Sequence, residues 1–105
     1  MEHYFIFNER LGIETPYIDE DWDEISVYTQ QSILLKWEMI RGRIPDQIAT
    51  LENTIRKKQN QLDNEEDFKI SCLLNSDIAE LASMINDLWL WYRVNQNISS
   101  SKAHV

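Results

Sequence analysis

The most regular stretch of the sequence is IPDQIATLENTIRKKQNQL, residues 44–62. Apolar residues recur in it at alternating steps of four and three, which is the spacing of a helix that packs along another helix. The positions on this face are Ile44, Ile48, Leu51, Ile55 and Leu62, with Lys58 in the remaining place. Pro45 suits the first turn of a helix, because an N–H there has no helical partner. The stretch therefore predicts a helix over 44–62 that forms one arm of a helical hairpin.

The residues after this stretch supply the second arm. Asp63–Glu66 is a polar turn, and Asn64 with Asp67 has the spacing of a helix N-cap. We expect a helix over 65–95. Its continuity through Asn75–Asp77 stays open, because polar side chains there compete with the helical backbone bonds. The main apolar stripe is predicted to hold Phe68, Cys72, Ile78, Leu81, Ile85, Leu88 and Tyr92.

Another helix is predicted before the hairpin, over 21–41. Asp21 and Glu24 have the spacing of a capping box. Gly42 is placed to end this helix in the left-handed conformation. The apolar stripe is predicted to run through Ile25, Tyr28, Leu35 and Met39 with Trp22 at its start, and to be widened by Ile33, Trp37 and Ile40.

Residues 1–20 are interpreted as an irregular, extended, aromatic arm. Residues 3–7 could form a short strand, but no partner strand is evident. We expect the arm to dock four apolar side chains onto the helices: Phe5, Phe7, Ile13 and Tyr17. The predicted fold class is all-α, with three helices of which the second and third form an antiparallel hairpin. A single domain is expected over 1–97, followed by a disordered tail over 98–105.

The composition excludes several classes of protein. The chain has 105 residues, and its single cysteine cannot form an internal disulfide, which favours a reducing, cytoplasmic location. Met1–Tyr4 lack the basic start and apolar run of a secretory leader, and no apolar run reaches the roughly 20 residues of a membrane helix. Two glycines cannot build a phosphate-binding loop, and the two histidines lie at opposite ends of the chain. We therefore expect no cofactor, no metal and no membrane association.

The charge is strongly negative overall, with a formal net charge of −8. Residues 25–62 hold three acidic and six basic side chains, whereas the segments on either side are acidic. We expect the acidic flanks to fold against the basic middle and neutralise it. An anionic chain repels phosphates, so direct nucleic-acid binding is not expected.

The strongest candidate for an interface is the aromatic run Leu88-Trp89-Leu90-Trp91-Tyr92. Together with preceding apolar residues it gives the last helix an apolar arc that is wider than one hairpin partner can cover. Two readings stay open: the first helix and the arm cover it, or it binds another protein or a second copy of the chain. The candidate interface residues are Met84, Leu88, Trp89, Trp91 and Tyr92.

Three acids of the last helix form a second candidate site: Asp77, Glu80 and Asp87. Paired carboxylates of this kind hold Mg²⁺ in some helical phosphohydrolases. Such sites need converging acids from a second helix, and residues 44–62 offer no matching pair.

The acidic segment Asp19–Glu24 has acids at every second position, as in the start of a calcium loop. Glu24 and Gln30 stand where that loop needs glycine and glutamate, so no calcium site is predicted. The segment is instead interpreted as a negatively charged helix start. A third hypothesis makes it a phosphate mimic that binds a basic protein.

Residues 79–88, AELASMINDL, resemble a short segment of the small sporulation phosphatases that act on a response regulator and are two-helix hairpins. Ser83 and Asp87 keep the four-residue step of that segment, but residues 84–86 do not match its centre. We assign no catalytic role from this resemblance.

These observations lead to one functional expectation. The chain is expected to be a small acidic cytoplasmic protein of non-enzymatic type that acts through a helical protein–protein interface, as a regulator, adaptor or inhibitor, or by self-association into a helical bundle. The alternative is a metal-assisted phosphohydrolase that uses the acids of the last helix.

Overall fold

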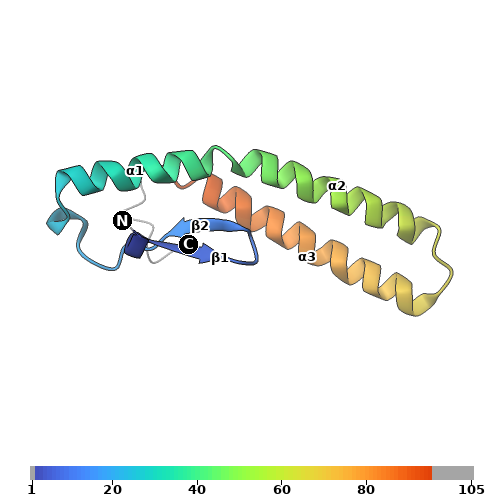
Figure 1. Ribbon diagram of the computed structural model, residues 1–105. Coiled ribbons are helices and arrows are strands. Elements are labelled where there is room, and N and C mark those ends of the chain that lie inside the picture. Colours follow the sequence, from blue (N-terminus) through green and yellow to red (C-terminus); the bar gives the residue numbers. More distant parts are fainter. Residues whose placement is uncertain (1, 96–105) are drawn as a thin grey trace.

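A helical hairpin forms one half of an elongated molecule of 60 × 21 × 19 Å, in a computed structural model that describes residues 2–95 (Figure 1). The long helices are α1 (Val27–Arg41), α2 (Ile44–Asp63) and α3 (Phe68–Tyr92). They are preceded by two 3-10 helices, η1 (Glu2–Tyr4) and η2 (Trp22–Glu24), and by two strands, β1 (Phe5–Asn8) and β2 (Ile13–Pro16). The described residues thus hold five helical segments, not the three that the sequence predicted. None of these helices combines the length and apolarity needed to cross a bilayer.

The packing of α2 against α3 confirms the predicted hairpin. In α2 the inward positions are the expected ones, and Ile44 and Ile48 are buried. In α3 the inward row is Ser71, Leu74, Ile78, Leu81, Ile85 and Leu88, again at steps of three and four. The predicted stripe was therefore wrong at its start, because Phe68 and Cys72 lie on the outer side.

The N-terminus of α3 also differs from the prediction. The capping residue is Asp67 and not Asn64: its Oδ1 accepts from the backbone N–H groups of Lys69 at 2.9 Å and Ile70 at 3.3 Å. A carboxylate there satisfies N–H groups that lack helical partners and also suits the helix dipole. From this cap the helix is continuous through Asn75–Asp77 and ends at Tyr92.

The helix predicted over 21–41 is divided into two elements. Asp21 caps η2, accepting from the N–H of Asp23 at 3.2 Å, and Ile25 is extended. Ser26 then caps α1 by accepting from the N–H of Thr29 at 3.2 Å. The sequence thus contains two competing caps five residues apart, and each starts its own helix.

Gly42 does not adopt the left-handed conformation that the sequence predicted. Its φ of −64° and ψ of −18° are right-handed helical values, and Arg43 is helical too. The backbone therefore turns little between α1 and α2, and the two helices lie nearly in line along one edge of the molecule (Figure 1).

The N-terminal arm is a β-hairpin, so the prediction of an all-α fold with an irregular arm was wrong here. β1 and β2 are antiparallel, with Phe5 opposite Pro16 and Asn8 opposite Ile13. The turn needs Gly12, which has φ +72° and donates its N–H to the Asn8 carbonyl at 2.8 Å. The partner strand escaped prediction because it is only four residues long and ends in a proline.

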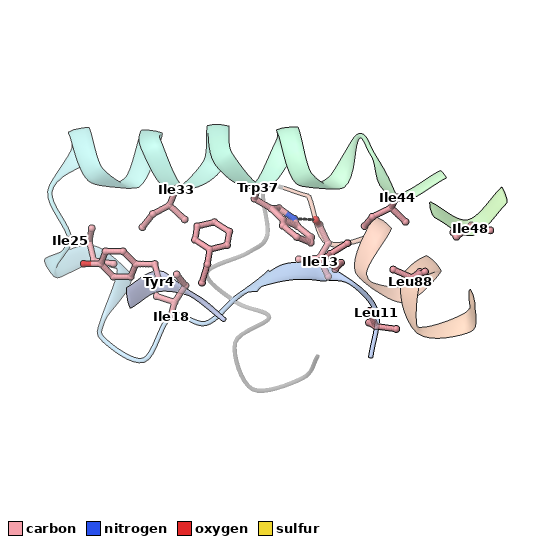
Figure 2. Packing of buried hydrophobic residues seen from close by; sticks show 12 residues of the cluster. Tyr4, Leu11, Ile13, Ile18, Ile25, Ile33, Trp37, Ile44, Ile48 and Leu88 are labelled. Atoms are coloured by element: carbon pink, nitrogen blue, oxygen red, sulfur yellow. Dashed lines mark hydrogen bonds between the residues drawn. The ribbon is translucent and has the colours of Figure 1, made fainter. Parts of the chain in front are cut away.

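The core lies where this β-hairpin packs beneath α1 and against the C-terminal end of α3 (Figure 2). Phe5 and Ile13 are buried as expected, whereas Phe7 and Tyr17 are exposed. On α1 the buried side chains are Ile33 and Trp37, which the sequence analysis had placed at the edge of the stripe. The disordered tail predicted for 98–105 lies outside the described residues.

Candidate functional site

The aromatic residues predicted as an interface lie mostly inside the molecule. Leu88 is fully buried in the core, and Met84 is partly buried against it. Trp91 meets Trp37 of α1 edge-on, with 5.8 Å between ring centroids. Trp89 packs edge-on against Tyr92 at 5.5 Å but keeps 39% of its surface exposed. Of the five predicted residues, Trp89 thus presents the largest exposed face.

Two polar contacts from α1 fix this aromatic end of α3. The indole Nε1 of Trp37 donates to the carbonyl oxygen of Val94, within the core. Arg41 donates through Nη1 to the Tyr92 carbonyl at 2.7 Å, and its guanidinium lies 4.8 Å from the centre of the Tyr92 ring. Carbonyls at a helix end lack helical partners, so these donors satisfy them. The first helix therefore covers much of the aromatic arc.

The acids of the second candidate site are engaged by basic side chains. Arg10, in the turn of the β-hairpin, donates through Nε to Glu80 and through Nη1 to Asp87, each at 2.7 Å, and through Nη2 to Ser83 at 2.8 Å. The hydrogen bonds to Glu80 and then Asp87 raise the pKa of Arg10. Asp77 lies one turn away and pairs with Lys58 of α2 at 3.1 Å.

These ion pairs connect elements and do not form a metal centre. Within residues 2–95 no three His, Cys, Asp or Glu side chains are placed to hold a metal ion. Arg10 fastens the β-turn to the middle of α3, and Lys58 bridges the two arms of the helical hairpin. Neither contact was predicted from the sequence, because the paired residues are 19 to 77 positions apart.

The acidic segment Asp19–Glu24 precedes α1 and includes η2. Gln30 donates through Nε2 to the Trp22 carbonyl at 2.7 Å, which fixes η2 against the first turn of α1. Tyr4 donates its hydroxyl to Glu20, and this bond, together with burial and the nearby negative charge, raises the pKa of Tyr4. No ion pair within the described residues links this segment to a basic side chain. Neutralisation of the acidic flanks is therefore seen elsewhere, at Lys36 with Glu14 and at Lys58 with Asp77.

A solvent-facing apolar stripe on α1 was not predicted as a surface. Tyr28, Leu35 and Met39 are exposed by 80%, 65% and 57%, on the side of the helix away from the buried Ile33 and Trp37. The sequence shows two apolar stripes on this helix, and the prediction placed the wrong one in the core. No local signal separates the two stripes, because the β-hairpin that covers Ile33 and Trp37 lies elsewhere in the sequence.

The tip of the helical hairpin carries another exposed apolar cluster, made by the first turns of α3. Phe68 and Leu73 are exposed by 79% and 64%, and Ile70 and Cys72 in the same turns are exposed too. Phe68, Lys69, Cys72 and Leu73 line a shallow hollow of about 370 Å³. We call this cluster of Phe68, Ile70, Cys72 and Leu73 the hairpin tip. Its residues lie off the row from Ser71 to Leu88 that faces α2, which is why they are exposed.

Compared with protein-family models, with curated proteins and with solved structures, the chain matches none of them.

Proposed function

We propose that this chain is a small non-enzymatic interaction protein, a regulator, adaptor or inhibitor, that binds a partner protein through its hairpin tip. The observation that supports this is the exposure of Phe68 and Leu73 at the far end of the helical hairpin. Phe68, Cys72 and Leu73 line one shallow hollow, so their apolar surface is contiguous, and contiguous apolar surface is a mark of interaction sites. Phe68 projects from the first turn of α3 and so offers an aromatic anchor for a pocket on a partner.

The charge around the hairpin tip indicates the kind of partner. The chain segment that leads into α3 contains four acids, Asp63, Glu65, Glu66 and Asp67. These four acids outnumber Lys69, which lines the hollow, so the surroundings are acidic overall. An apolar centre with such a rim is complementary to a surface with apolar pockets and lysine or arginine at its edge. We therefore expect a protein partner with a basic rim, and neither nucleic acid nor a lipid surface.

Trp89 and the acids of α3 have smaller parts in this proposal. Trp89, with Leu90 exposed beside it, remains a proposed second contact near the other end of α3. The phosphohydrolase alternative has little support, because its acids are already in ion pairs: Glu80 and Asp87 with Arg10, and Asp77 with Lys58.

The test begins with a photo-crosslinking residue placed at Leu73 in cells that naturally make the protein. Gln59, an exposed polar position on α2, serves as the control position. We expect a defined adduct from position 73 only. The captured protein is then purified and its affinity for the chain is measured.

The variants Phe68→Ser and Leu73→Ser should each weaken that affinity about tenfold or more, which is the loss of about 1.4 kcal/mol expected at an interface anchor. Leu35→Ser is the matched control, since Leu35 and Leu73 are exposed to the same extent, 65% and 64%. Equal affinity for Leu73→Ser and the unaltered chain would contradict the proposal.

A further inference from the structure

The apolar stripe on α1 has the spacing of a helix–helix seam. Tyr28, Ser32, Leu35, Met39 and Gly42 follow one another at steps of four, three, four and three, and none of them is charged. Their side of α1 faces away from the core. We infer that this stripe docks a second copy of the same chain, with the two α1 helices antiparallel across a two-fold axis.

One register makes the stripe complementary to itself. A two-fold axis midway between Ile33 and Leu34 along α1 places Tyr28 opposite Met39 of the second copy. It also places Leu35 opposite Ser32 of the second copy, so that a large side chain meets a small one. Because a two-fold interface uses the same patch twice, each of these contacts occurs twice.

The charges at the two ends of α1 favour this antiparallel arrangement. In the antiparallel arrangement Arg43, just beyond the C-terminus of α1, lies near the acidic segment that precedes α1 in the second copy and ends at Glu24. Both residues are exposed, and no ion pair within residues 2–95 involves either of them. Gly42 and Arg43 keep helical backbone angles, so Arg43 stays in line with α1. A parallel pair would instead bring the two acidic segments Asp19–Glu24 together, where like charges repel.

The size of the seam sets the expected affinity. A helix of 15 residues is about 22 Å long and offers less than the roughly 800 Å² per partner of a standard interface. We therefore expect a micromolar dimer that dissociates on dilution. The hairpin tip lies at the far end of the molecule from α1, so the dimer leaves it free (Figure 1).

The test is sedimentation equilibrium of the full chain over about a hundredfold range of concentration around the micromolar region. Leu35→Ser should raise the dimer dissociation constant at least about tenfold, because symmetry removes two leucines at once. Leu73→Ser, equally exposed at the hairpin tip, should leave the constant unchanged. Circular dichroism checks that both variants are folded.

A charge exchange tests the antiparallel arrangement of the two α1 helices. Glu24→Arg and Arg43→Glu should each weaken the dimer several-fold, and the double variant should restore it, since opposite charges again face each other. A chain that is monomeric throughout, a dimer that dissociates with Leu73→Ser but not with Leu35→Ser, or a double variant without recovery would each overturn the inference. None of these outcomes depends on binding of a foreign protein, so the proposed function fails or stands separately.

Discussion

Replacing Trp37 with phenylalanine tests how α1 holds the C-terminal end of α3. The indole of Trp37 is fully buried in the core and donates through Nε1 to the Val94 carbonyl (Figure 2). It also lies edge-on to Trp91. Phenylalanine keeps an aromatic ring in the core but removes the N–H donor and part of the volume. The substitution therefore separates the anchoring bond from general hydrophobicity.

The expected loss follows from two terms. The smaller ring leaves a gap of about 40 Å³, which costs about 1 kcal/mol at about 24 cal/mol per Å³. The Val94 carbonyl loses its buried donor, which costs about 1–2 kcal/mol more. We expect the free energy of unfolding to fall by about 2–3 kcal/mol, a large share of the total for a small domain, and Tm to fall by about 10 °C.

The assay is urea unfolding followed by circular dichroism, with Trp89→Phe as the control. Trp89 is partly exposed, and its contact with Tyr92 lies within α3, so its replacement should cost less than 1 kcal/mol. An unchanged m-value shows that the variants unfold from the same folded state. A loss for Trp37→Phe no larger than that of the control would refute the anchoring role.

Three further predictions follow from single contacts. Gly12→Ala should destabilise the fold by about 1 kcal/mol, because the φ of Gly12 is +72°. Gly42→Ala should be neutral or stabilising by up to about 1 kcal/mol, because Gly42 is helical. Thermal unfolding compares the two variants. The bond to Glu20 raises the pKa of Tyr4 above its ordinary value of 10.0. This contact therefore stabilises the fold below pH 10.0, and the stabilisation is lost as pH rises through the raised pKa. Ultraviolet titration should show one tyrosine that ionises at higher pH than the others, and Tyr4→Phe should remove it. Arg10→Gln breaks two ion pairs to α3 and should speed amide hydrogen exchange in residues 8–12 without changing it in α2.

The α2–α3 hairpin was predictable because its decisive contacts are periodic in sequence. Ile44, Ile48 and Leu51 repeat at steps that only one face of a helix can satisfy. The same rule failed at the start of α3, where Phe68 and Cys72 also fit a helical stripe. Periodicity identifies apolar faces but does not say which face meets the other arm. In the structure the row from Ser71 to Leu88 faces α2, and Phe68 and Cys72 do not.

The N-terminal half was less predictable because its contacts are between distant residues. The β-hairpin beneath α1 decides that Ile33 and Trp37 are buried while Leu35 is exposed. The bond from Arg10 to Asp87 spans 77 positions and carries no local signal. The acids of the second candidate site were therefore found from the sequence, but their role in anchoring the turn of the β-hairpin was not predicted.

The exposed stripe of α1 supports an interaction role because its apolar side chains lie outside the core. Single exposed apolar side chains are common on soluble proteins, so exposure alone has little meaning. Tyr28, Leu35 and Met39, however, share one face at helical spacing, opposite a second apolar face that already supplies the core. If the stripe contributed only to the monomer, Leu35→Ser would lower Tm. We expect Tm to stay unchanged in dilute solution and to fall relative to the unaltered chain only at concentrations where the dimer forms, because association stabilises the folded state by mass action.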